Sequence, residues 1–244
     1  MGKKGFTLVE LLIAMVVGLV IMAAIYGMMS LGQQSSASVD RRVLTQQDVR
    51  AVLDLMAMEI RMASFNPTRT AATWGTVPTC NVLGLTTIKP NRKGIQIATP
   101  NSILIAMDLW DGDNAKDPPE PDSIIGGTAS NESISYAYNS GAGTITRIVD
   151  CANSDIILGA DGSSTKVVND VNTPVFQYFI IDPLTNVERA LDPALGELNV
   201  DNNIAVIRRI RITIVADVET QGRIQVSRRT YSTDVLVRNH VLSP

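Results

Sequence analysis

The longest hydrophobic run of the chain lies near its N-terminal end. From Leu11 to Met29 every residue is apolar, glycine or tyrosine, and no charged residue occurs between Glu10 and Asp40. As a helix, residues 6–31 would span about 39 Å, which is enough to cross a bilayer with some tilt. The pattern therefore predicts a membrane-spanning helix here.

A second apolar pattern follows this run and has helical spacing. Apolar side chains recur every three or four residues, which is typical of one face of an amphipathic helix. The stripe consists of Val39, Val43, Gln46, Val49, Leu53, Met56, Ile60 and Ala63. Asn66-Pro67 is expected to end it, because the residue before a proline is pushed out of the helical conformation. We expect one helix of about 60 residues, whose stripe packs against a sheet.

After Pro67 the hydrophobic period changes to two, and turn-rich pieces separate short apolar runs. We expect strands at residues 94–98, 102–109, 132–139, 144–149, 175–181, 205–216 and 223–237, the last broken near Ser232. In the most regular strand, Val206, Ile210, Ile212 and Ile214 share one face, and Arg209, Arg211 and Thr213 share the other. The chain is therefore expected to be α+β, with a long N-terminal α-helix packed against an antiparallel β-sheet head whose other face meets water.

A single carboxylate, Glu10, stands at the head of the membrane run, with Lys3 and Lys4 before it. The lysines predict a cytoplasmic N-terminus. A cleaved signal peptide has an apolar core of about 7–15 residues and a small-residue site; this run is longer, although residues 36–38 mimic such a site. An uncleaved anchor accepts the length but leaves Glu10 unexplained, because a charge in a membrane is unfavourable unless it is paired.

Cleavage between Gly5 and Phe6 would explain both features. Glu10 becomes the fifth residue, and the new α-amino group of Phe6 in one subunit would neutralise Glu10 of a neighbour. The string Gly5-Phe6-Thr7-Leu8-Val9-Glu10, preceded by basic residues and followed by the apolar helix, resembles the type IV pilin family, which includes the type II secretion pseudopilins. The resemblance implies a prepilin peptidase that cuts after Gly5, N-methylation of Phe6, an inner-membrane assembly platform and assembly into a helical fibre.

A second resemblance lies at the expected end of the helix. Residues 59–67, Glu59-Ile60-Arg61-Met62-Ala63-Ser64-Phe65-Asn66-Pro67, are similar to the helix-end motif of PilW-type minor pilins, with Ser64 where that group usually has glycine. The long, non-repetitive head and Arg238-Asn239 fit the same group. The alternative is a J-like pseudopilin of the type II secretion pseudopilus tip.

These resemblances imply a structural subunit and not an enzyme. It would join other minor pilins and the major pilin in the complex that initiates and caps a type IV pilus. The implied organisation is a leader peptide at 1–5, a transmembrane and fibre-core helix at 6–31, an amphipathic half at 32–66 and a periplasmic head at 67–244. Such a chain passes once through the inner membrane before it enters an extracellular pilus or a periplasmic pseudopilus.

Composition argues against a nucleic-acid binder. The net charge is −3; Lys3, Lys4 and Glu10 sum to +1, which leaves −4 for the rest of the chain. Arginines 208, 209, 211, 223, 228, 229 and 238 would form a basic stripe, but Tyr231 is the only aromatic residue among them. We expect a solvated strand face, or arginines paired with acids, rather than a DNA-binding surface.

Cysteine and histidine are rare in this sequence. Cys80 and Cys151 have no nearby Cys or His, so zinc spacing is absent. They form either one disulfide, which we favour, or two partly buried free thiols. The sole histidine, His240, is expected to be solvated in the tail. A Gly-rich phosphate loop and a Gly-x-Ser-x-Gly elbow are also missing from the sequence, which argues against catalysis.

The acidic stretch at 108–122 is the best candidate for binding a ligand. Calcium takes about six to eight oxygen ligands, which closely spaced carboxylates in a turn supply. The candidates are Asp108, Asp111, Asp113, Asp117, Glu120 and Asp122. The stretch is not an EF-hand, because Lys116 stands where a loop starting at Asp111 needs glycine. A different calcium loop and a solvated acidic loop both remain open, and no other cofactor is indicated.

Overall fold

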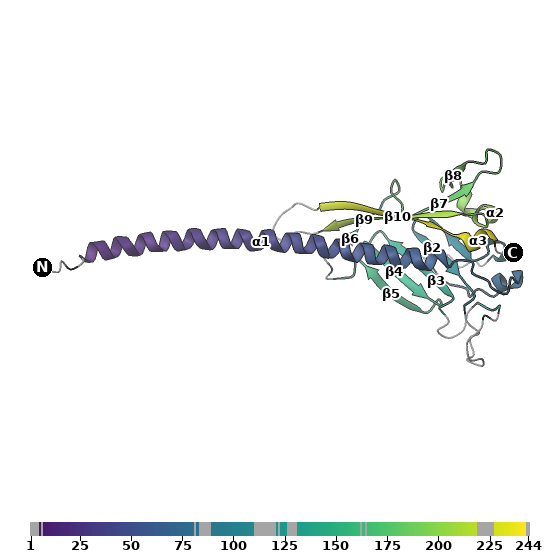
Figure 1. Ribbon diagram of the computed structural model, residues 1–244, viewed down its shortest axis with the longest axis horizontal. Coiled ribbons are helices and arrows are strands. Elements are labelled where there is room, and N and C mark those ends of the chain that lie inside the picture. The colour runs from purple at the N-terminus through teal and green to yellow at the C-terminus, as the bar shows by residue number, and fades with distance from the viewer. Residues whose placement is uncertain are drawn as a thin grey trace.

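The chain folds into one long helix that carries a β-rich head at its C-terminal end (Figure 1). The computed structural model describes residues 5, 7–80, 82, 89–109, 121, 123–125, 131–161, 163, 165–218 and 227–242. Helix α1 (Leu8–Arg61) is 54 residues long. It ends before the predicted Asn66, because Ser64 adopts a left-handed conformation with φ of 63°.

Two antiparallel sheets build the head. The first has the order β1-β2-β3-β4-β5, and in the second, of order β10-β9-β7-β8, β6 also pairs with β9. The strands of the first sheet are β1 (Ile95–Ala98), β2 (Ser102–Ala106), β3 (Ser133–Asn139), β4 (Thr144–Val149) and β5 (Asn153–Leu158). Those of the second are β6 (Thr165–Val167), β7 (Phe176–Ile181), β8 (Glu188–Ala190), β9 (Arg209–Val218) and β10 (Ser227–Leu236). The short helices are η1 (Ala71–Gly75), η2 (Pro90–Arg92), η3 (Glu197–Asn199), α2 (Asp201–Ile204) and α3 (Arg238–Leu242).

The expected α+β architecture is confirmed, and several details of it are corrected. Strands β5, β6 and β8 were not expected, because their sequences are polar or very short and lack a clear alternation. The strand expected from residue 205 begins only at Arg209, since α2 precedes it and Val206 is exposed. Strand β10 runs through Ser232 without the expected break; residues 223–226 lie outside the described part.

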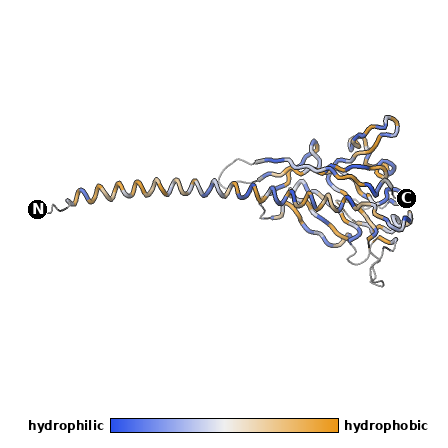
Figure 2. Tube along the Cα trace, viewed as in Figure 1, coloured by the Kyte–Doolittle hydropathy of each residue, from blue (hydrophilic) through white to orange (hydrophobic). Residues whose placement is uncertain are grey.

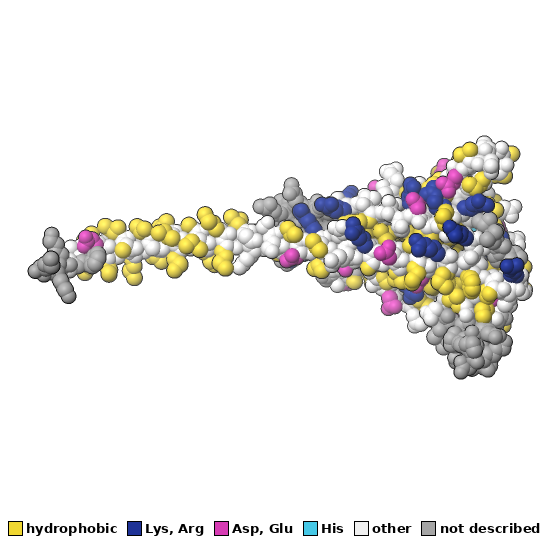
Figure 3. All heavy atoms as spheres, viewed as in Figure 1, with side chains coloured by type: hydrophobic (Ala, Val, Ile, Leu, Met, Phe, Trp, Pro, Cys, Tyr) yellow, Lys and Arg dark blue, Asp and Glu magenta, His cyan; other side chains and the backbone are white. Residues whose placement is uncertain are grey.

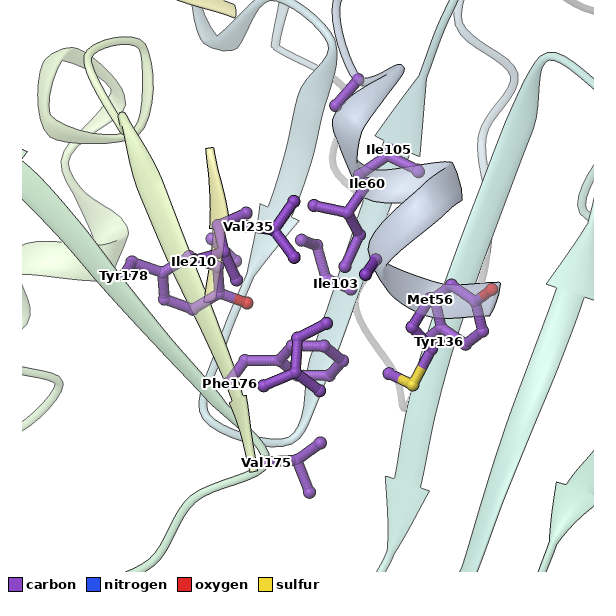
Figure 4. Close-up of a cluster of buried hydrophobic side chains, with 14 of the residues drawn as sticks. Met56, Ile60, Ile103, Ile105, Tyr136, Val175, Phe176, Tyr178, Ile210 and Val235 are labelled. Carbon is purple, nitrogen blue, oxygen red and sulfur yellow. The ribbon is translucent and has the colours of Figure 1, made fainter. Parts of the chain in front are cut away.

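The C-terminal part of α1 fills the space between the two sheets. Val49, Leu53, Met56 and Ile60 are buried, as the apolar stripe predicts, whereas Val39 and Val43 are exposed. The four buried residues pack with side chains from both sheets, including Ile103, Tyr136, Phe176, Ile210 and Val235 (Figure 4). Burial of this stripe from water is the main force that holds the helix in the head.

The two sheets differ in how their outer faces are covered. On β9, Ile210, Ile212 and Ile214 are buried while Arg209 and Arg211 are only partly covered, as expected for a sheet with one wet face. Strands β1 and β2 are buried on both faces, which corrects that expectation for the first sheet. Their outer face packs against Trp74, Cys80 and Val82 from the segment that follows the helix.

Candidate functional site

The N-terminal segment and its attachment to the head form the candidate site. Thr7 is the N-cap of α1 and forms a reciprocal capping box with Glu10. The backbone N–H and the hydroxyl of Thr7 each donate to Glu10 Oε2 at 2.9 Å, and the Glu10 N–H donates to Thr7 Oγ1 at 3.3 Å. Glu10 therefore has local partners at the free helix start of a single chain.

Thr7 is not among the functional residues predicted from the sequence. Thr7-Leu8-Val9-Glu10 matches the capping-box spacing, in which a threonine precedes a glutamate by three residues. This spacing is the sequence pattern from which the capping role of Thr7 can be predicted. Gly5 is exposed, and a protease can cut only a peptide bond that it can reach. Lys3, Lys4 and Phe6 lie outside the described residues.

The N-terminal part of α1 has no contacts with the head. It projects away from the head (Figure 2). Its residues 11–29 form an apolar rod, and large side chains such as Leu12, Val16 and Leu19 are more than half exposed. By length and composition, α1 is the one helix of the described residues apolar enough to cross a membrane. Burial in the head begins only at Thr45, whose hydroxyl contacts that of Thr165 at 2.8 Å.

An ion pair between a half-buried arginine and a buried glutamate joins the helix to the first sheet. Arg147 on β4 donates through Nη2 to Glu59 Oε1 at 2.6 Å and through Nε to Oε2 at 3.1 Å. The hydroxyl of Tyr136 on β3 donates a hydrogen bond to the same carboxylate. Burial, and then the bond to Glu59, raise the pKa of Tyr136 far above its usual range, so Tyr136 stays a donor. Glu59 therefore fixes the rotation of α1 against the sheet.

A second attachment point lies where α1 ends. The Ser64 N–H donates to the Ala106 carbonyl at 2.9 Å, and Ser64 Oγ accepts from the Gly94 N–H at 3.0 Å. His240 is fully buried, which corrects the expectation of a solvated tail residue. Its Nδ1 lies 2.6 Å from Ser64 Oγ, and its Nε2 lies 2.6 Å from the Ile204 carbonyl. The C-terminal helix α3 is thereby tied to the end of α1.

His240 is held neutral by this environment. Because Nε2 faces a carbonyl, it must carry the proton, so Nδ1 accepts from the Ser64 hydroxyl. Burial is the main cause that lowers the pKa of His240 to about 4 from 6.5, and the charge of Lys93 acts in the same direction. The sequence carried no signal for this contact, since the two residues are far apart in the chain.

The two cysteines are joined in the structure. Cys80 and Cys151 form a disulfide with a Cα–Cα distance of 4.9 Å and a sequence separation of 71. It links the segment after η1 to the β4–β5 turn, on the outer side of the first sheet. The disulfide holds that segment against the outer face of β1 and β2, and the segment thereby buries this face.

The other candidate residues are only partly described. Asp108 is buried, while Asp111, Asp113, Asp117, Glu120 and Asp122 lie outside the described residues. Within the described ranges, no cluster of three His, Cys, Asp or Glu has the geometry of a metal site. The calcium prediction therefore stays a prediction.

Several of the arginines pair with acids, as expected. Arg209 contacts Glu188 and Asp234, each at 2.6 Å, and Arg211 shares Asp234 at 3.0 Å. The hydrogen bond from Arg211 is the largest cause that lowers the pKa of Asp234. Arg228 contacts Asp217 at 2.9 Å. Arg223 lies outside the described residues.

Comparison with known proteins identifies one feature. Residues 1–26 match the family described as the prokaryotic N-terminal methylation motif. Neither the curated proteins nor the solved structures contain a match to this chain. The match covers the predicted leader, the capping box and most of the apolar run at residues 11–29. The motif therefore supports a place for this chain in a type IV pilin-like family.

Proposed function

We propose that this chain is a PilW-like minor pilin, a structural subunit that helps to initiate assembly of a type IV pilus and lies in its tip complex. After cleavage between Gly5 and Phe6, the apolar rod would pack in the fibre core and the head would face outward. The observation that carries the proposal is the position of Glu10, five residues into the processed chain and at the start of an exposed apolar helix.

The capping box adds a mechanism to this proposal. In a single chain, Thr7 satisfies the carboxylate of Glu10. In a fibre, the methylated amino group of a neighbouring Phe6 would supply the opposite charge that a carboxylate in an apolar core needs. Glu10 would thus be held at the helix start until a neighbour's N-terminus arrives, and it would then set the register between subunits.

The first test replaces the carboxylate. Glu10→Ala removes the partner of the neighbour's amino group, so the chain is expected to be processed and folded but lost from sheared fibres. Immunoblots of the fibre and membrane fractions measure this. Gln33→Ala changes an exposed position on the same helix and serves as the control. Normal incorporation of Glu10→Ala would refute the role of Glu10.

The second test addresses processing. Gly5→Leu places a bulky side chain at the cleavage junction, so the full-length precursor is expected to accumulate. A size comparison on a gel with wild type measures it, and unchanged processing would contradict the cleavage assignment. Recovery of the wild-type chain from a secretion pseudopilus, and not from pili, would instead support the J-like pseudopilin.

A further inference from the structure

Two strand edges of the head lie on either side of α1. Strand β10 ends the second sheet and β5 ends the first, and α1 contacts both. Figure 1 shows β10 on one side of α1 and β5 on the other. Within the described part of the chain, no further strand pairs with the outer edge of either one. Open strand edges present unpaired backbone groups, which a strand of another chain can bind.

The outer edge of β10 is long and regular. All ten residues pair with β9 in one continuous register, without a bulge and without proline. The Val237 N–H donates to the Arg208 carbonyl at 2.9 Å, so the odd-numbered residues face β9 and the even-numbered ones point their backbone groups outward. Thr230, Ser232 and Asp234 are exposed at this edge.

The two edges run in opposite directions relative to α1. The first residue of β10 pairs with Val218, and Val218 also pairs with Thr165, which contacts Thr45 of α1. The last residue of β10, Leu236, lines the same surface pocket as Arg61 of α1. Strand β10 therefore runs parallel to α1.

Strand β5 runs the other way. Its residue Asp155 pairs with Arg147, the partner of Glu59, and its end at Leu158 shares a hollow with Asp48. It therefore runs antiparallel to α1. If two subunits stand side by side with parallel helices, β10 of one and β5 of the next are antiparallel, which is the orientation that strand pairing favours.

Charge distinguishes the two sides in the same way. Figure 3 shows Lys and Arg side chains gathered on the β10 side of α1. Among the described residues, Arg61, Arg229 and Arg238 take part in no ion pair on the β10 side, where Asp54 of α1 is an acid without an ion-pair partner. Asp48 and Asp155 take part in no ion pair on the β5 side. A basic side on one copy and an acidic side on the next attract each other and favour one orientation.

From these observations we propose that the β10 edge of one copy of this chain pairs with the β5 edge of a second copy, with the two helices parallel. The inference rests on the proposed function, since the fibre or membrane holds the helices parallel. Two β10 edges paired with each other would instead place the helices antiparallel. The β10–β5 contact is head-to-tail, so each copy has one edge left for another subunit.

Cross-linking of the full-length chain in cells tests the pairing. Ser232→Cys on β10 and Ser154→Cys on β5 place exposed thiols on the outer face of each edge strand, while the native cysteines are already bridged. A short bifunctional maleimide is expected to produce a dimer only when both variants are made together. Thr185→Cys, exposed in the β7–β8 turn, replaces Ser232→Cys as the control and should give no dimer with Ser154→Cys.

The other outcomes overturn the inference. A dimer from Ser232→Cys alone would show two β10 edges in contact, and a product of a different mass would show that another subunit is the occupant. No product from chains that are present in sheared fibres would refute the pairing and leave the proposed function intact. Absence of the chain from fibres would refute both.

Discussion

At the scale of single residues, a few buried polar groups determine how the helix sits in the head. Glu59 has an arginine and a tyrosine as partners, and Ser64 has His240 and Gly94. Buried polar groups of this kind must be paired, because an unpaired one loses its hydration without compensation. Each contact joins residues from distant parts of the sequence, so hydrophobic spacing alone carries no sign of them.

The ion pair at Glu59 is expected to be essential for stability. Arg147→Met leaves a buried carboxylate without its cation, and loss of one partner of such a pair costs about 3–5 kcal/mol. Denaturant unfolding of the detergent-solubilised chain measures this. Arg211→Met is the matched control, since Asp234 is half-exposed and keeps Arg209; it should cost at most about 1 kcal/mol. Equal losses for the two variants would contradict the account.

Because His240 is buried in its neutral form, we expect the free energy of unfolding to depend on pH. Its pKa is lowered on folding, so its contribution is complete above the unfolded value of 6.5 and is lost as the pH falls from there toward about 4. Over that window the contribution of His240 to the free energy of unfolding should fall by roughly 3 kcal/mol. His240→Asn is expected to be less stable at neutral pH but to show a flatter profile. Unfolding free energies measured at several pH values test this, and parallel profiles for the two proteins would refute it.

At the scale of elements, the end of α1 is fitted closely to the first sheet. Gly94 passes so near Ser64 and Ala106 that any Cβ at position 94 would overlap their backbone atoms. Ser64 itself holds a positive φ, the conformation that glycine adopts most easily. A serine at this position therefore keeps a glycine-like backbone and adds two hydrogen bonds through its hydroxyl group.

Gly94→Ala is expected to destabilise the head by about 1–3 kcal/mol, because overlapping backbone atoms must move apart. Gly75→Ala is the control, since nothing lies within 4 Å of a Cβ at that position. The difference in melting temperature between the two variants measures the effect. A Gly94→Ala variant as stable as the control would show that the contact is not tight.

The disulfide is expected to stabilise the segment that covers the first sheet. A bridge between residues 71 positions apart contributes up to about 4 kcal/mol in the chain-entropy model. Replacement of both cysteines by serine should lower the melting temperature and make the segment near Trp74 sensitive to protease. An unchanged cleavage pattern and melting temperature would show that the segment is held by its apolar contacts alone.

Sequence patterns predicted the elements far better than their arrangement. The run of residues 11–29 and the stripe through Ile60 identify α1, because helical burial leaves a period in the sequence. The division into two sheets left no such sign, since it depends on which strands pair. In the candidate site, Gly5 and Glu10 were found from their spacing, whereas Arg147 and His240 were not, because their contacts form only in the folded chain.

At the scale of the whole molecule, the chain has two parts that differ in how their apolar surface is covered. The apolar rod has no contacts within a single chain, so its packing surface is satisfied only by a membrane or by other helices. The head has its own core and is stabilised by the disulfide and the buried pairs. This division fits the proposed function, in which the surroundings of the apolar rod change while the head keeps its fold.

Cleavage after Gly5 and incorporation into a fibre are the two events on which the proposed function depends. Mass spectrometry of the N-terminal peptide, isolated from sheared fibres, detects both. We expect a peptide that begins at Phe6 and carries one methyl group on its α-amino nitrogen. A fibre fraction without the chain, or a chain in fibres that still begins at Met1, would contradict the proposed function.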